Sequence, residues 1–231
     1  MNVYYNPVRT YQGEGCLNKL LDFTRQVGKE DAPVLLLLCR KEMEEVEGIS
    51  QLLQQLGERA MVICFPHSNP DIHQLYTLYT QTKDRQPGLV ITVGGGSTMD
   101  VGKSLCCLYP MEISSPQQLR EIIAEKKYQA PSCPWIGVAT TAGTGSEVTC
   151  WATIWDPQCN VKYSIERPDN YAWAALADPQ LLYTMPLGLG VSSAVDALTH
   201  AAESYWAKAT NAVSRAMALS AIRIVMEHID D

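Results

Sequence analysis

Residues 90–103 read Val-Ile-Thr-Val-Gly-Gly-Gly-Ser-Thr-Met-Asp-Val-Gly-Lys, and this stretch decides the expected fold. The apolar run from Leu89 to Val93 is rich in β-branched residues, which predicts a buried parallel strand. The segment that opens with Ser97 has the composition of a helix N-terminus. Between them, Gly94, Gly95 and Gly96 let the backbone approach an anion closely. Free backbone N–H groups and the helix dipole then stabilise the charge of that anion. The stretch therefore predicts a phosphate-binding turn, with a tight turn that binds no ligand as the alternative.

A second polar loop follows another apolar run. Residues 135–139 predict a buried strand, and residues 140–149 then read Thr-Thr-Ala-Gly-Thr-Gly-Ser-Glu-Val-Thr. The hydroxyl groups of this loop suit the pyrophosphate and ribose of a nucleotide; they belong to Thr140, Thr141, Thr144 and Ser146. A turn that bonds only to its own backbone is the alternative. Because both loops emerge at the carboxyl edge of a parallel sheet, where ligands bind, the pair favours a nucleotide site.

Strands and helices alternate along the first 186 residues. The sequence predicts strands at 3–5, 34–38, 60–65 and near 173–177, besides the two above, and a hairpin over 153–163. Helices are expected at 17–27, 41–56, 72–82, 97–109 and 112–129. This order predicts a doubly wound, Rossmann-like parallel α/β sheet. From residue 192 the sequence is rich in alanine with no strand candidate, so we expect an α/β domain over 1–186 and the start of an all-α domain over 187–231.

Composition excludes several classes of protein. The chain has 46% hydrophobic and 19% charged residues, as soluble globular proteins do, and its net charge of −7 argues against nucleic-acid binding. The longest strongly apolar run, Val34–Cys39, is too short to cross a membrane. The eight cysteines form no Cys-x-x-Cys pair and no signal peptide precedes them, so we expect free thiols in the cytoplasm. The expected edge strand at 3–5 could pair with a second subunit, which favours a homodimer.

Asp196 and His200 lie four positions apart in the predicted C-terminal helix. This spacing places a carboxylate and an imidazole on one helix face, where they can hold one divalent metal ion. A surface hydrogen bond or charge pair is the alternative. The flanking residues are apolar, and polar groups in such surroundings need partners, of which a metal is one.

Four patterns now stand in order along the chain: the glycine turn, the 140–149 loop, Asp178-Pro179, and Asp196-x-x-x-His200-Ala201-x-Glu203. Together they resemble the iron-containing, metal-dependent alcohol dehydrogenases, whose nucleotide domain is similar to dehydroquinate synthase. The resemblance covers essentially the whole chain. It implies hydride transfer between NAD(P) and a small aldehyde or alcohol, with Fe²⁺ or Zn²⁺ on Asp196 and His200. It implies cofactor contacts across both loops and at Asn69, Asp100, Lys162 and Leu182.

The chain also departs from the family. The family supplies two further histidine ligands downstream of His200, whereas His228 is the only later histidine here. His228 falls near an apolar stripe close to a predicted helix end, which favours a structural or surface role. Two protein ligands hold a metal weakly, so we expect these 231 residues to bind nucleotide better than they reduce a substrate. The alternatives are a non-catalytic nucleotide-binding or oligomerisation module and an enzyme of the glycerol dehydrogenase or dehydroquinate synthase type.

Two finer expectations concern the cofactor and the substrate. Arg40 and Lys41 follow the strand at 34–38, where NAD-selective folds place an acidic residue, so NADP(H) is favoured over NAD(H). A solvated helix start is the alternative. The segments 4–7, 203–206 and 211–215 look most like phosphonoacetaldehyde reductases. Arg215 and Asn211 are then the expected phosphonate contacts, with a surface arginine as the alternative.

Overall fold

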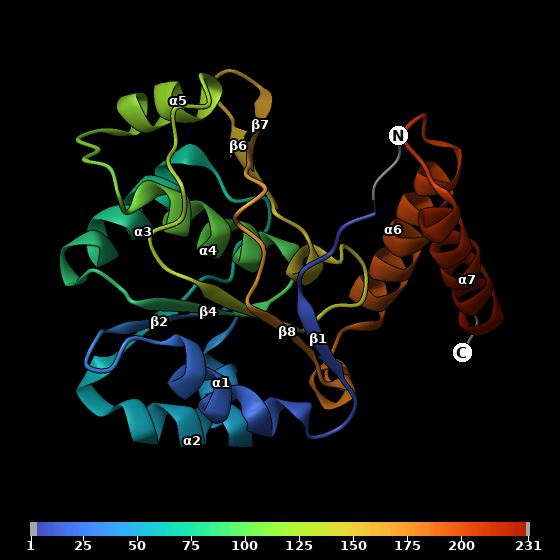
Figure 1. Ribbon diagram of the computed structural model, residues 1–231, viewed down its shortest axis with the longest axis horizontal. Helices are drawn as coiled ribbons and strands as arrows, with labels where there is room; N and C mark the ends of the chain where they lie inside the picture. The colour runs from blue at the N-terminus through green and yellow to red at the C-terminus, as the bar shows by residue number, and fades with distance from the viewer. Residues whose placement is uncertain (1–3, 230–231) are drawn as a thin grey trace.

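The computed structural model of the protein describes residues 4–229, and its centre is a six-stranded parallel sheet (Figure 1). The strand order is β1-β8-β5-β4-β2-β3. The bounds are β1 (Arg9–Gln12), β2 (Val34–Leu38), β3 (Ala60–Cys64), β4 (Leu89–Gly94), β5 (Trp135–Ala139) and β8 (Ala174–Ala177). Helices α1 (Leu20–Val27) and α2 (Glu47–Leu56) cover one face, while α3 (Ile72–Thr82), α4 (Gly96–Leu108) and α5 (Pro116–Ala124) lie over the other. This is the doubly wound α/β fold that the sequence predicts.

The side chains of β2 alternate between two hydrophobic cores. Leu35 and Leu37 pack on the side of α3 and α4, whereas Leu36 and Leu38 pack on the side of α1 and α2. None of these four side chains is exposed to solvent. Burying a leucine stabilises the fold by about 2 kcal/mol, so the continuous apolar run explains why β2 lies inside the sheet.

The N-terminal edge strand lies further along the chain than the sequence predicts. Tyr4 and Tyr5 are in a loop, Val3 lies outside the described residues, and β1 begins only at Arg9, where it pairs in parallel with β8. Pro7 cannot donate a backbone hydrogen bond to a sheet, and the Asn6 side chain accepts one from Val8 N. The expectation of a strand at 3–5 is therefore wrong.

Two of the expected helices are shorter than predicted. The segment 41–56 divides into the 3-10 turn η2 (Lys41–Glu45) and α2, because Val46 is extended. The segment 112–129 forms a helix only over α5, which begins after Ser115, whose hydroxyl accepts from Gln118 N. A 3-10 turn, η1 (Cys16–Lys19), also precedes α1.

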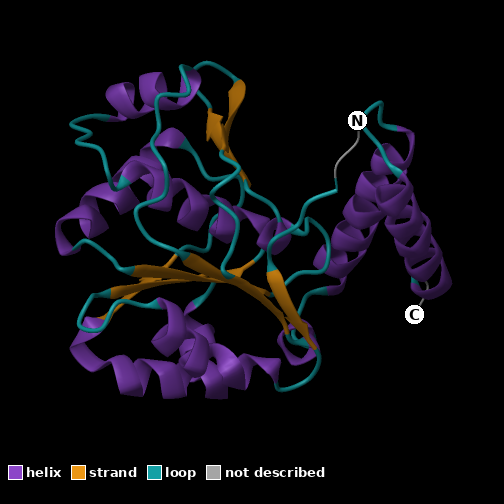
Figure 2. Ribbon diagram, viewed as in Figure 1, coloured by secondary structure: helices purple, strands orange, loops and turns teal. Residues whose placement is uncertain are grey.

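The chain becomes helical at residue 187. Helices α6 (Leu187–Trp206) and α7 (Ala212–His228) pack on each other to one side of the sheet (Figure 2). Helix α6 starts directly after Pro186, five residues earlier than the alanine-rich composition indicates. The division into domains at residue 186 remains a prediction. In the part of the chain that the structure describes, no helix is long and apolar enough to cross a membrane.

A small antiparallel hairpin completes the fold. Strands β6 (Trp151–Asp156) and β7 (Val161–Glu166) pair with each other, as the sequence predicts, and pack near α4. The backbone N–H of Trp155 donates to the carbonyl of Pro70 over 2.8 Å. The hairpin is thereby attached beside the loop that precedes α3.

Candidate functional site

A cleft of about 610 Å³ opens at the carboxyl edge of the sheet, next to the start of α6. Its walls include the turn between β4 and α4 and the loop after β5. Of the residues singled out in the sequence, it brings together Arg40, Asn69, Gly95, Gly96, Ser97, Thr140, Thr141, Thr144 and Asp196. The remaining ones do not line it: Gly94, Asp100, Ser146, Lys162, Leu182, His200, Asn211 and Arg215.

The glycine turn leaves little room for side chains. A Cβ on Gly95 would lie 3.0 Å from Thr141 Oγ1, and one on Gly96 would lie 3.1 Å from Thr144 Cγ2. The two loops therefore face each other across a narrow gap, in which the glycine turn exposes its backbone. The first N–H groups of α4 begin there, in the arrangement that binds phosphate groups.

Gly95, not Ser97, is the N-cap of α4, which corrects the expected helix start. The cap residue is extended and provides no side-chain cap, so helix N–H groups at this end are not bonded to a capping side chain. The Ser97 hydroxyl accepts a hydrogen bond from the backbone N–H of Asn69 over 3.1 Å. Ser97 thus connects the glycine turn to the opposite wall of the cleft.

Asp100 and Ser146 lie behind the cleft rather than in its wall. The Ser146 hydroxyl donates to Asp100 Oδ1 over 3.2 Å, and the Thr153 N–H donates to Asp100 Oδ2 over 3.1 Å. Burial raises the pKa of Asp100, although Lys103 and these hydrogen bonds oppose the shift. The expected cofactor contacts of Asp100 and Ser146 stay predictions.

Lys103 is a buried cation that the sequence analysis did not single out. Its side chain is fully buried, and Nζ donates to Ser146 Oγ, Thr149 Oγ1 and the Trp151 carbonyl over 2.8, 3.0 and 2.8 Å. Burial lowers the pKa of Lys103 to about 8, while the carboxylates of Asp100 and Glu147 oppose this shift. The only sequence signal was its position one helical turn after Asp100.

Lys162 and Leu182 lie near the cleft but do not line it. Lys162 is on β7, with Nζ 4.3 Å from the centre of the Trp155 ring. Leu182 is in the 3-10 turn η6 (Pro179–Leu182), and its neighbour Leu181 is the residue that faces the cleft. Their proposed cofactor contacts stay predictions.

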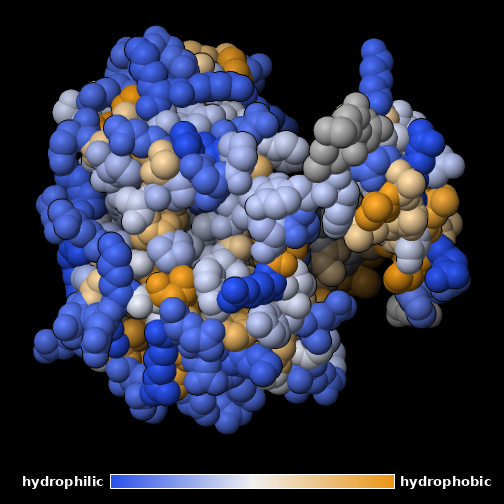
Figure 3. Space-filling view, viewed as in Figure 1, coloured by the Kyte–Doolittle hydropathy of each residue, from blue (hydrophilic) through white to orange (hydrophobic). Residues whose placement is uncertain are grey.

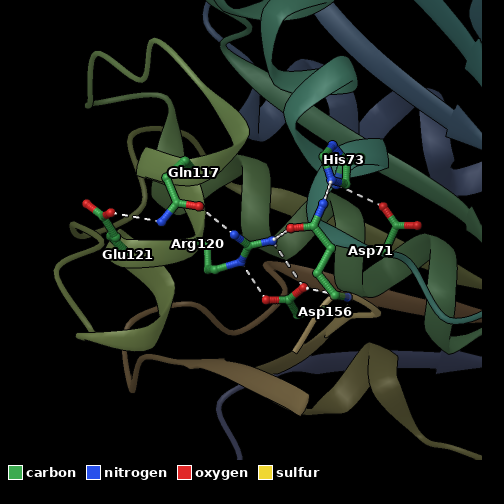
Figure 4. Close-up of polar contacts among 7 residues, drawn as sticks. Asp71, His73, Gln117, Arg120, Glu121 and Asp156 are labelled. Carbon is green, nitrogen blue, oxygen red and sulfur yellow. Dashed lines mark hydrogen bonds and ion pairs between the residues drawn. The ribbon is translucent and has the colours of Figure 1, made fainter. Parts of the chain in front are cut away.

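A polar network fixes the hairpin next to this cleft (Figure 4). Arg120 on α5 makes two bonds to the Asp156 carboxylate, from Nε to Oδ2 over 2.5 Å and from Nη2 to Oδ1 over 3.2 Å. The same guanidinium donates to Gln158, whose amide contacts the His73 ring. His73 N donates to Asp71, the N-cap of α3. The network therefore connects α5, the hairpin turn and the start of α3, two residues after Asn69.

Asp196 and His200 face each other on α6 as the spacing predicts. Asp196 Oδ2 and His200 Nδ1 are 3.7 Å apart, and the two side chains are 43% and 55% exposed respectively. Among residues 4–229, no group of three or more His, Cys, Asp or Glu side chains could hold a metal ion. Asp196 and His200 could therefore supply two of the ligands of a metal ion, and further donors would be needed to complete a catalytic site.

Gly143 brings α6 close to the second loop. A Cβ on Gly143 would lie 2.9 Å from the Ser193 carbonyl oxygen and 3.0 Å from Ser193 Cα. These are backbone atoms and cannot rotate away. Ser193 precedes Asp196 by one helical turn, so this contact sets the distance between the loop and the Asp196–His200 pair.

The residues considered for cofactor and substrate selectivity are separated in space. Arg40 lines the cleft, and its Nη2 donates to Thr184 Oγ1 over 2.7 Å. The Asn211 side chain caps α7 by accepting from Val213 N and Ser214 N, and the Arg215 guanidinium carbon lies 5.7 Å from the centre of the Tyr205 ring. A substrate role for Asn211 and Arg215 stays a prediction.

The fold and the cleft define an α/β protein with a glycine-rich cleft at the carboxyl edge of its sheet. The family profile described as iron-containing alcohol dehydrogenase matches residues 7–179, and the C-terminal profile of the same family matches residues 190–231. The chain belongs to the iron-containing alcohol dehydrogenase family, as the sequence motifs indicate.

Individual relatives agree with this assignment. The NAD-dependent methanol dehydrogenase of Bacillus methanolicus is 25% identical over 99% of this chain and 59% of its own length. The NADPH-dependent butanol dehydrogenase of Clostridium saccharobutylicum is 27% identical over 96% of this chain and 56% of its own length. The crystal structure of sulfoacetaldehyde reductase from Bifidobacterium kashiwanohense with NAD⁺ is 24% identical, with a TM-score of 0.85 over 99% of this chain and 60% of that one. The chain thus spans less than two thirds of the relatives it matches.

Proposed function

We propose that this chain provides the nucleotide-binding part, and two ligands of the metal site, of a metal-dependent alcohol dehydrogenase or aldehyde reductase that uses NAD(P). The observation that carries the proposal is the cradle formed by Gly95 and Gly96, where even a Cβ would lie 3.0 to 3.1 Å from the threonines of the facing loop. Such close backbone approach suits a pyrophosphate at a helix N-terminus. The hydroxyls of Thr140, Thr141 and Thr144 supply hydrogen bonds along the same cleft.

The Asp196–His200 pair supports the metal part of the proposal. A bound Fe²⁺ or Zn²⁺ would polarise the substrate oxygen while hydride passes to or from the nicotinamide. Asp196 lines the cleft together with the threonine loop, and Gly143 fixes the approach of α6 to that loop. This chain's own residues would thus orient a nucleotide, while Asp196 in the cleft wall and its neighbour His200 on α6 would supply two metal donors.

Nucleotide titration of the 231-residue chain tests the proposal. We expect NADPH or NADH to bind with a dissociation constant on the order of 10 μM, seen as a change in nicotinamide fluorescence. Added Fe²⁺ or Zn²⁺ should give little reduction of small aldehydes, since catalytic sites of this type take at least three protein ligands. Absence of nucleotide binding would contradict the proposal, and efficient turnover would show that two ligands suffice.

We propose NADP(H) as the preferred cofactor because Arg40 lies in the cleft wall, two residues after the end of β2. A 2′-phosphate would form charge-assisted hydrogen bonds with this guanidinium. Arg40→Gln should raise the dissociation constant for NADPH about tenfold and change that for NADH little, which paired fluorescence titrations would measure. Arg59→Gln is the control, because Arg59 does not line the cleft. Tighter binding of NADH than of NADPH by the unmodified chain would refute the preference.

Finer assignments are also proposals. A small aldehyde or alcohol is the proposed substrate class, and phosphonoacetaldehyde would require Arg215 to approach the cleft from α7. A homodimer is proposed because β1 is an edge strand whose described pairing is with β8 alone. A cytoplasmic location is proposed because the eight cysteines are free thiols. Figure 3 shows apolar residues at the surface over α6 and α7, and the exposed apolar side chains of α7 include Met217, Leu219, Ile224 and Met226. We propose them as a second surface for association. Sedimentation of the purified chain measures its oligomeric state.

A further inference from the structure

Lys103 lies in a place where an ammonium group is costly to bury. It is the one lysine among the buried residues of the described chain, and no part of its side chain reaches solvent. Its Nζ lies 5.3 Å from the centre of the Trp135 ring. A lysine is retained in such surroundings only when its hydrogen bonds are well satisfied.

All three hydrogen bonds of this ammonium go to the end of the Thr140–Thr149 loop and to the first residue of β6. The acceptors are Ser146 Oγ, Thr149 Oγ1 and the Trp151 carbonyl. Ser146 accepts from Lys103 and donates its own hydroxyl proton to Asp100. One turn of α4 thus supplies both a cation and an anion to the same serine, which ties residues 146–151 to the helix that begins at the glycine turn.

The connection continues to the wall of the cleft. The backbone N–H of Ser146 donates to Thr144 Oγ1 over 3.2 Å. Thr144 in turn lies against Gly96, where a Cβ would be 3.1 Å from its side chain. A chain of contacts therefore runs from Lys103 through Ser146 and Thr144 to the gap between the two loops.

We propose that Lys103 is a positioning residue for the dinucleotide, holding the Thr140–Thr149 loop at the distance from the glycine turn that a pyrophosphate requires. This inference rests on the proposed function, and in it Lys103 acts through the loop without touching the ligand. The carboxylates of Asp100 and Glu147 offset the charge of the ammonium, so the role of Lys103 is to position the loop rather than to attract the anion directly.

Protonation of Lys103 should make the nucleotide affinity depend on pH. The groups that face it are Asp100 on the same helix, Glu147 in η5 (Ser146–Val148), and Cys150 before β6. With its pKa near 8, Lys103 is charged at pH 7 and neutral at pH 9.5. The neutral amine loses a donor and its charge, so nucleotide affinity should fall as the pH rises through about 8.

The experiment compares NADPH titrations of the unmodified chain and of Lys103→Met between pH 7 and pH 9.5. We expect Lys103→Met to raise the dissociation constant about tenfold at pH 7 and to be insensitive to pH. The unmodified chain should approach the value of the variant at pH 9.5. Cys150→Ala is the matched control for the neighbouring thiol, and it should keep the pH transition.

A second variant keeps the test decisive if Lys103→Met does not fold. Thr149→Val removes one acceptor of the ammonium while preserving shape, so the transition should move to lower pH, because the charged form loses a hydrogen bond. If the NADPH dissociation constant of the unmodified chain did not change with pH, or if the same pH transition persisted in Lys103→Met, the role of Lys103 would be overturned. The proposed function would still stand in either case. Failure of the unmodified chain to bind NADPH at any pH would overturn the proposed function and this inference together.

Discussion

Gly95→Val is expected to raise the dissociation constant for NADPH or NADH by about 100-fold while leaving the fold intact. The backbone of Gly95 has φ −86° and ψ −169°, a conformation open to any residue, so valine introduces no backbone strain. Its Cβ would lie 3.0 Å from Thr141 Oγ1, and its methyl groups would occupy the gap between the loops. A phosphate would then lose contact with the N–H groups at the start of α4. Two charge-assisted bonds of about 1.5 kcal/mol each correspond to this factor.

Gly188→Val is the matched control for this substitution. Gly188 is exposed in the first turn of α6, and a Cβ there would meet no atom within 4 Å. Fluorescence titration should give an unchanged dissociation constant for this variant, and circular dichroism should show both variants folded. Unchanged affinity in folded Gly95→Val would mean that the nucleotide binds elsewhere than at the glycine turn.

The elements around the cleft were the most predictable part of the fold. Strands β2, β4 and β5 are each buried along their whole length, so apart from Thr92 and two glycines their residues are apolar. The edge strand β1 has no such pattern, because three of its four residues are exposed. Its position depends on pairing with β8, a contact across more than 160 residues that composition does not encode.

In the candidate site, too, the features set by neighbouring residues were predictable and those set by long-range packing were not. Local spacing was enough to place Asp196 beside His200 and to identify the two loops, because i,i+4 pairs and strand–glycine–helix turns are local features. Lys103 escaped notice because a lysine in a predicted helix is normally solvated. Its three acceptors lie 43 to 48 positions away in the chain, so only the packing of α4 against the hairpin segment brings them together. Arg120 and Asp156, 36 positions apart, were missed for the same reason.

Arg120→Met is expected to lower the melting temperature of the protein by about 10 °C at pH 7, because it leaves a buried carboxylate without its partner. Asp156 is 1% exposed and receives two bonds from the guanidinium, while the Arg120 side chain is itself only 14% exposed. Methionine fills a similar volume without supplying a charge. Arg167→Met is the matched control, since Arg167 pairs with Asp169 at an exposed site, and it should change the melting temperature by no more than about 2 °C.

The effect should also depend on pH in a defined direction. The hydrogen bond and charge of Arg120 lower the pKa of Asp156, so the pair stabilises the folded state above the ordinary carboxyl pKa and loses this effect as the pH falls further. The difference in melting temperature between Arg120→Met and the unmodified protein should therefore be full at pH 7 and shrink below about pH 4. The double variant Arg120→Met, Asp156→Leu should recover most of the lost stability, because an apolar pair needs no charge partner. If Arg120→Met lowered the melting temperature at pH 7 no more than Arg167→Met does, the prediction would be wrong and solvent would have to reach Asp156. The hairpin would then be held by the backbone pairing of Trp155 rather than by the ion pair.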